Sequence, residues 1–257
     1  MDKTIVYHKK VKLNKPIMLV GLPGIGNVGS IVGKYLKDAL GAKKFAVLQS
    51  PHFPHQVVMQ KNGGMRIVNN RFYYYKSKAG KPDIVILIGD TQAGSPEGQY
   101  DVNEKIVMFF KKLGGTTVYT VGGYNVGNQY VHTPRVFAVV SDKATKVKLV
   151  KYGIVFGKAA GMIWGSAGMI AAFAKKYGMS SACIMGETGL LEMDANSAKA
   201  VLEVLKKLLY LDVDLGDIEK IKKETERMLK EIEEATKTMA GGPPADPGHG
   251  EAIPYIR

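Results

Sequence analysis

The chain has 257 residues, a length that fits one large domain or a domain with an appendage. Hydrophobic residues make up 46% and charged residues 23%, which excludes a disordered chain, a collagen-like repeat and a disulfide-stapled miniprotein. The net charge of +13 lies entirely within the first 81 residues, which hold 15 Lys and Arg but only two acidic residues. This asymmetry is compatible with a polyanionic partner, but the lysines are dispersed among core positions, so we favour solvated strand and helix faces.

The sequence carries no sign of export or of membrane insertion. The single cysteine, Cys183, cannot form an internal disulfide, and the first ten residues lack the apolar segment of a signal peptide. The longest uncharged apolar stretch, Ala159–Ala174, has 16 residues, fewer than the roughly 20 that span a bilayer. We therefore expect a cytoplasmic protein that does not bind membranes.

The first elements predict a buried strand followed by a helix. Pro16–Leu22 is a nearly continuous apolar run, which is typical of a buried parallel strand. Asn27–Leu40 places its apolar residues on one side at helical spacing, and Gly41 ends the helix. A short strand, Phe45–Leu48, then leads into a β-rich insertion near residues 50–80. The insertion contains a predicted hairpin and a third strand-like piece, at His55–Gln60, Met65–Asn69 and Arg71–Lys76.

Strands and helices alternate again after residue 82. The predicted strands are Asp83–Ile88, Thr116–Val121, Arg135–Val140 and Ser181–Met185. The predicted helices are Glu97–Leu113, Ser166–Tyr177 and a segment that runs from the N-cap Asp194 to Leu209. This alternation predicts an α/β layered domain over residues 1–215, with a mainly parallel sheet and the β-rich insertion.

Beyond residue 215 the composition changes twice. Asp217–Lys237 alternates charges around a narrow apolar stripe, which predicts a mostly solvated helix over residues 216–238, paired along one seam. Residues 239–257 predict a flexible tail, because Gly241–Gly250 is rich in Gly and Pro. The tail ends in the apolar heptapeptide Glu251–Arg257, which is either tucked onto its own protein or offered to a partner.

A G-x-G-x-x-G motif, Gly24–Gly29, lies between a predicted strand and a predicted helix, as in dinucleotide-binding proteins. Such a site also needs an acidic residue at the end of the second strand, but that strand ends in Gln49-Ser50-Pro51. Asp38 lies inside the helix and cannot serve. We therefore favour a tight turn whose glycines let the helix approach the sheet closely.

No other motif specifies an enzyme or a metal site. His52 and His55 have no third ligand nearby, and Gly165–Gly168 is not a G-x-S-x-G nucleophile elbow. Several polar residues follow predicted strands, where α/β sites form, but they fit equally well as caps and turn residues: Asp90, Glu97, Glu187, Asp194 and His132. We predict no catalytic, cofactor-binding or metal-binding residues.

Five motifs, in order, resemble the proteasome assembly chaperone family in its archaeal branch. They are Gly21–Gly29 followed by Tyr35-Leu36, Ile86–Gln92, Gly98–Tyr100, Gly122–Tyr124 and Gly165–Gly168. The resemblance implies an α/β core like that of nucleoside phosphorylases and peptidyl hydrolases, without their catalytic residues. It also implies assembly into homo-oligomers and a role as an ATP-independent chaperone or activator of the 20S proteasome.

The same resemblance gives the C-terminus a role. In that family, and in proteasome activators generally, a C-terminal hydrophobic-Tyr-any tripeptide inserts between α-subunits, where its terminal carboxylate pairs with a lysine. Here the chain ends in Ile253, Pro254, Tyr255, Ile256 and Arg257, so the tyrosine is third from the end instead of second. Three hypotheses follow: the tail binds the α-subunits in a shifted register, binds them weakly, or is stored on the protein's own surface.

We therefore predict a non-enzymatic chaperone or activator that binds the 20S proteasome α-ring through this tail. We expect a homo-oligomer larger than a dimer, with a paralogue as a further candidate partner and no cofactor. The alternatives are a nucleotide-binding enzyme or sensor that uses the Gly24–Gly29 turn, and an RNA-binding module that uses the basic first third of the chain.

Overall fold

The computed structural model describes residues 3–60, 62–78, 80–127, 130–157, 161–189, 193–216 and 218. These residues belong to one compact unit, Met1–Lys222, and a second unit comprises Lys223–Arg257. The predicted helix over residues 216–238 and the predicted tail over residues 239–257 lie outside the described residues, apart from Gly216 and Ile218. The domain boundary after residue 215 therefore stays a prediction.

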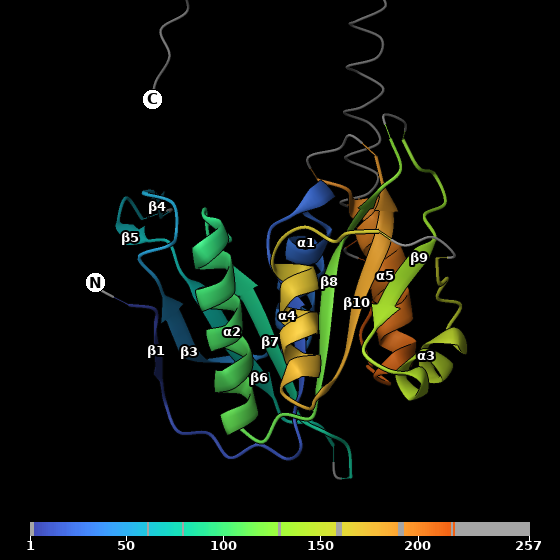
Figure 1. The fold of residues 1–257 in the computed structure, drawn as a ribbon, viewed down its shortest axis with the longest axis horizontal. Coiled ribbons are helices and arrows are strands. Elements are labelled where there is room, and N and C mark those ends of the chain that lie inside the picture. Colours follow the sequence, from blue (N-terminus) through green and yellow to red (C-terminus); the bar gives the residue numbers. More distant parts are fainter. Residues whose placement is uncertain are drawn as a thin grey trace, which may run out of the picture. The chain divides into compact units, whose positions relative to one another are not determined.

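An eight-stranded sheet forms the centre of the described unit, in the order β1-β3-β6-β7-β2-β8-β10-β9 (Figure 1). Its strands are β1 (Ile5–His8), β2 (Ile17–Gly21), β3 (Lys43–Gln49), β6 (Asn70–Tyr75), β7 (Ile84–Gly89), β8 (Thr117–Asn125), β9 (Val136–Val140) and β10 (Ser180–Thr188). The four central strands β7, β2, β8 and β10 are parallel, and antiparallel strands border them on both sides. The predicted α/β domain is confirmed, with its parallel strands at the centre of a mixed sheet.

Helices cover both faces of this sheet. On one face pack α1 (Val28–Ala39), which follows the short 3-10 helix η1 (Ile25–Asn27), and α5 (Ala195–Leu208). On the other face pack α2 (Pro96–Lys112) and α4 (Ser166–Lys176), while α3 (Lys143–Val150) lies beside β9 (Figure 1). Every residue of β2 and β7 is buried, as expected for parallel strands covered on both faces. Within the described ranges, no helix has the length and apolar character needed to cross a membrane.

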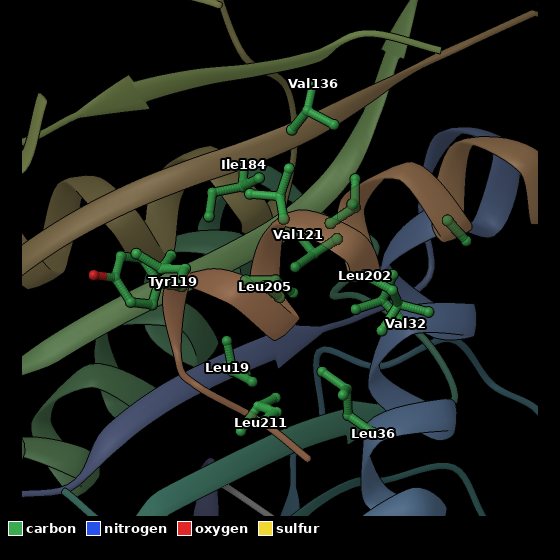
Figure 2. Packing of buried hydrophobic residues seen from close by; sticks show 14 of the residues in the cluster. Leu19, Val32, Leu36, Tyr119, Val121, Val136, Ile184, Leu202, Leu205 and Leu211 are labelled. Atoms are coloured by element: carbon green, nitrogen blue, oxygen red, sulfur yellow. The ribbon is translucent and has the colours of Figure 1, made fainter. Parts of the chain in front are cut away.

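Two apolar cores hold the helices to the sheet. Figure 2 shows the core under α1 and α5, with side chains from both helices, from β2, β8, β9 and β10, and from the segment after α5: Leu19, Val32, Leu36, Tyr119, Val121, Val136, Ile184, Leu202, Leu205 and Leu211. On the opposite face, the ring centroids of Phe45, Phe72 and Phe109 lie 5.0 to 6.3 Å apart. These contacts fix the position of the strand ends, where candidate sites form.

The fold differs from the sequence prediction at three places. The strand at residues 70–75 belongs to the central sheet, between β3 and β7, so the insertion reduces to the hairpin β4 (Val57–Met59) and β5 (Met65–Ile67). The edge strand β1 and the helix α3 were not predicted. Strands β8 and β10 run on to Asn125 and Thr188, beyond the predicted ends at Val121 and Met185.

Candidate functional site

The glycine turn before α1 is locked into the junction between β10 and α5. Gly26 adopts a left-handed conformation with φ 60°, and a Cβ at this position would lie 2.6 Å from the Thr188 hydroxyl oxygen. The Gly26 carbonyl accepts a hydrogen bond from the Asp194 N–H at 2.8 Å. Thr188 in turn donates to the Asp194 carboxylate at 2.7 Å. The turn is therefore part of the packing between two elements.

The next glycines bring α1 onto the sheet. A Cβ at Gly29 would lie 2.6 Å from the carbonyl oxygens of both Leu22 and Val121. A Cβ at Gly33 would lie 2.8 Å from a methyl group of Ile88. Since any larger side chain would push the helix away, the geometry agrees with the interpretation of this motif as a packing turn.

A small hollow adjoins the turn, between Gly24, Gly122 and Trp164. Its volume is about 50 Å³, against roughly 300 Å³ or more for a typical small-molecule site. Gln92 closes one side, because its side-chain amide donates to the Pro23 carbonyl and accepts from the Ser166 N–H. The hollow in this structure is too small for a nucleotide.

Asp90, which directly follows β7, binds two arginines. Its carboxylate accepts hydrogen bonds from Arg66 of β5 at 2.5 and 2.8 Å and from Arg71 of β6 at 2.8 Å. Burial disfavours the charged carboxylate, but the hydrogen bonds from Arg66 and the Asn69 N–H and the charges of both arginines outweigh it. The pKa of Asp90 is therefore lowered to about 2. Asp90 ties the hairpin to the central sheet.

The other polar residues near the strand ends also act as caps, first-turn residues or ion-pair partners. Glu187 accepts hydrogen bonds from the Arg135 side chain at 2.5 and 2.9 Å, and this hydrogen bonding is the main cause of its lowered pKa. Asp194 caps α5 by accepting from the Ser197 N–H at 2.8 Å, as predicted. Glu97 lies in the first turn of α2. The roles of Asp194 and Glu97 match the cap-and-turn interpretation of the sequence, whereas Asp90 and Glu187 are ion-pair partners instead.

Of the two histidines considered as metal ligands, His52 lies beside the first turn of α2, where a Cβ at Gly98 would lie 2.4 Å from its Cβ. His52 has its Nε2 3.9 Å from the Asp101 carboxylate. Among the residues that the structure describes, no three His, Cys, Asp or Glu side chains cluster as metal ligands would. In the described part of the chain, no third side chain joins His52 and His55 to form a metal site.

The hairpin presents an apolar surface that the sequence interpretation missed. Val57, Met59, Met65 and Ile67 all point to solvent, with Met59 87% and Met65 76% exposed, and we call these four residues the hairpin face. The residues between them point the other way: Val58 packs on the core, and Arg66 binds Asp90. The alternation of inward and outward residues along the two strands could be seen in the sequence. The sequence did not show which set of residues faces the core.

A second exposed apolar group lies at the loop before α4. Trp164 is 85% exposed, and Met162 beside it is also exposed. Exposed apolar groups of this kind are typical of protein–protein contact surfaces. The five predicted contact residues, Ile253, Pro254, Tyr255, Ile256 and Arg257, lie outside the described residues, so their role stays a prediction.

Comparison with known protein families finds a match over most of the chain. The sequence model of the PAC2 family matches residues 18–234 of this chain. The uncharacterized protein MJ1210 of Methanocaldococcus jannaschii is 35% identical over 255 residues, which is 98% of this chain and 97% of that protein.

Solved structures agree with this match. Pyrococcus furiosus PbaB, described as an archaeal proteasome activator, has a TM-score of 0.85 at 34% identity and covers 91% of this chain and 100% of its own. PbaA of the same organism, described as an archaeal homolog of proteasome-assembly chaperone, has a TM-score of 0.72 at 26% identity over 93% of this chain and 97% of its own. The resemblance seen in the motifs is confirmed, and the chain belongs to the PAC2 family.

Proposed function

We propose that the protein is a non-catalytic partner of the 20S proteasome that forms a homo-oligomer larger than a dimer and binds the α-ring through its C-terminal residues. The observation that carries this proposal is the similarity, at 34% identity and over nearly the whole chain, to a structure described as an archaeal proteasome activator. The protein acts in the cytoplasm, and a paralogue is a further candidate partner.

The strand ends support a role in contact rather than in catalysis. Asp90, Glu187 and Asp194 are engaged in ion pairs and caps, and the hollow beside the glycine turn measures about 50 Å³. Exposed apolar side chains, by contrast, project from the hairpin and from the loop before α4. Large exposed apolar side chains favour binding to another protein.

The tail has the chemistry of an anchor. Tyr255 supplies a large amphipathic ring with few rotatable bonds, and such rings dominate small interfaces. The Gly- and Pro-rich segment before it gives each tail reach. Several tails of one oligomer then engage one ring together, so weak individual affinities combine through effective concentration.

A single substitution tests this role. Tyr255→Ala should abolish or greatly reduce binding to immobilised 20S α-subunits while leaving the melting temperature and the oligomer mass unchanged. Tyr210→Ala is the matched control, because it removes an exposed tyrosine of the described unit and should leave binding intact. Equal binding of all three proteins would show that Tyr255 is not an anchor.

Removing Arg257 tests the register of the tail. The shortened chain ends in Pro-Tyr-Ile, which places the tyrosine second from the end. Binding to the α-subunits should become stronger if the terminal carboxylate makes a contact. Unchanged binding would show that the tail binds without that contact.

A further inference from the structure

A groove with positively charged walls runs between the edge strand β1 and the helix α2. Its volume is about 320 Å³. It is lined by residues of both elements and of the segment just before β1, among them Lys3, Ile5, Val6, Lys105, Met108 and Lys112. The three helix residues lie on one side of α2, because they are three and four positions apart.

Among the described residues, no carboxylate forms an ion pair with the lysines of this groove. These lysines, Lys3, Lys105 and Lys112, are exposed. Asp101, one turn of α2 before Lys105, accepts a hydrogen bond from the uncharged Thr4 hydroxyl, so its carboxylate offsets one of the three lysine charges. The groove therefore carries a positive potential that an anionic partner would lower.

The backbone of β1 is open on the side away from β3. Among the described strands, β1 pairs only with β3. The Lys9 N–H donates to the Phe45 carbonyl at 2.8 Å, so the antiparallel alternation turns the backbone groups of Val6 and His8 to the free edge. A row of unpaired N–H and C=O groups is a template for another strand.

We propose that this edge binds an extended acidic segment of a partner protein, added to the sheet as a strand beside β1. In such a strand every second side chain lies on the α2 side, where carboxylates pair with Lys105 and Lys112. The apolar wall formed by Val6 and Met108 accepts an aliphatic side chain between them. This inference does not depend on binding to the proteasome.

The chemistry of the groove selects this occupant over two others. Edge-to-edge pairing with β1 of a second copy would bring two lysine-bearing edges together, which repel each other. A single-stranded nucleic acid needs exposed rings on which bases stack, but the two rings that line the groove, Phe109 and His8, pack against each other with centroids 5.3 Å apart.

The test uses the full-length protein and a fluorescein-labelled hexapeptide of alternating Glu and Val, with binding followed by fluorescence anisotropy. Lys105→Glu combined with Lys112→Glu should weaken binding by about tenfold or more, because it reverses both helix charges. The control, Lys143→Glu with Lys207→Glu, makes the same change in net charge on exposed lysines of α3 and α5 and should alter the affinity by less than about twofold.

A backbone probe separates strand addition from charge attraction alone. N-methylation of one alternate set of peptide residues should abolish binding, while methylation of the other set should be tolerated, since an added strand uses alternate N–H groups. Equal effects of the two sets, equal losses in the two lysine variants, or no binding to the wild type would overturn the proposal. So would tighter binding of a labelled oligo-dT than of the peptide, or a lower oligomer mass of the Lys105 and Lys112 variant, which would assign the groove to nucleic acid or to a second copy.

Discussion

At the scale of single residues, Gly26 combines a left-handed backbone with a close contact. We expect Gly26→Ala to lower the free energy of unfolding by more than Gly41→Ala, measured by denaturant titration. Gly41 has nearly the same φ, 59°, but no atom within 4 Å of an added Cβ, so its substitution reports the backbone strain alone, about 1 kcal/mol. Gly26→Ala adds the clash with Thr188 and should cost about 2 kcal/mol or more. Equal losses of unfolding free energy in the two variants would show that the Thr188 side chain moves aside without cost.

The same turn predicts the response to nucleotides. Because its glycines serve the packing of α1, adding NAD or ATP should leave the melting temperature of the wild type unchanged. A ligand that binds the native state must raise stability as its concentration increases. A concentration-dependent rise with either compound would restore the alternative of a nucleotide-binding enzyme or sensor.

Asp90 makes stability depend on pH in a defined direction. Its pKa is lowered from 3.8 to about 2 in the folded protein, so its contribution is present above about pH 4 and is lost as the pH falls towards 2. The shift corresponds to about 2 kcal/mol. The difference in unfolding free energy between wild type and Asp90→Asn should therefore shrink between pH 5 and pH 2. A difference that stays constant over this range would contradict the pairing with Arg66 and Arg71. Glu104→Gln, at a solvent-screened ion pair, is the control and should have a much smaller effect.

At the scale of elements, the central strands could be predicted because their apolar runs reflect burial on both faces, as at Ile17–Gly21. That residues 70–75 belong to the central sheet could not be predicted, because their run of four aromatic residues does not tell which strand lies opposite. Helix α3 escaped prediction because Val147 and Val150 are exposed, which breaks the helical apolar pattern. The tight β10–α5 contact of the glycine turn depends on Thr188, more than 150 residues away in sequence.

The hairpin shows the same limit for a candidate site. Its strands could be predicted from the glycine-rich turn, but its orientation depends on Arg66 reaching Asp90, which lies 24 residues further along the chain. That ion pair turns Met59 and Met65 to solvent. The exposed side of such a hairpin can be recognised only once the partner of its inward-facing residue, here Asp90 for Arg66, is known.

At the scale of the whole molecule, we expect a homo-oligomer larger than a dimer in light scattering at micromolar concentration. The physical reasons are the hairpin face, which a lone chain leaves exposed to water, and the narrow apolar stripe predicted for Asp217–Lys237, which favours pairing along one seam. Deleting the chain from Asp217 onward should lower the mass, whereas deleting only residues 251–257 should not. A mass of one chain for the wild type would contradict this expectation.

The central claim is that the C-terminal residues bind the proteasome α-ring. The most direct measurement compares the full-length protein with a chain that ends at residue 250, both flowed over immobilised 20S α-subunits in a surface-binding assay. We predict clear binding of the full-length protein and loss of nearly all binding on removal of residues 251–257, with melting temperature and oligomer mass unchanged. Undiminished binding of the shortened chain would contradict the account and would assign the contact to the folded unit.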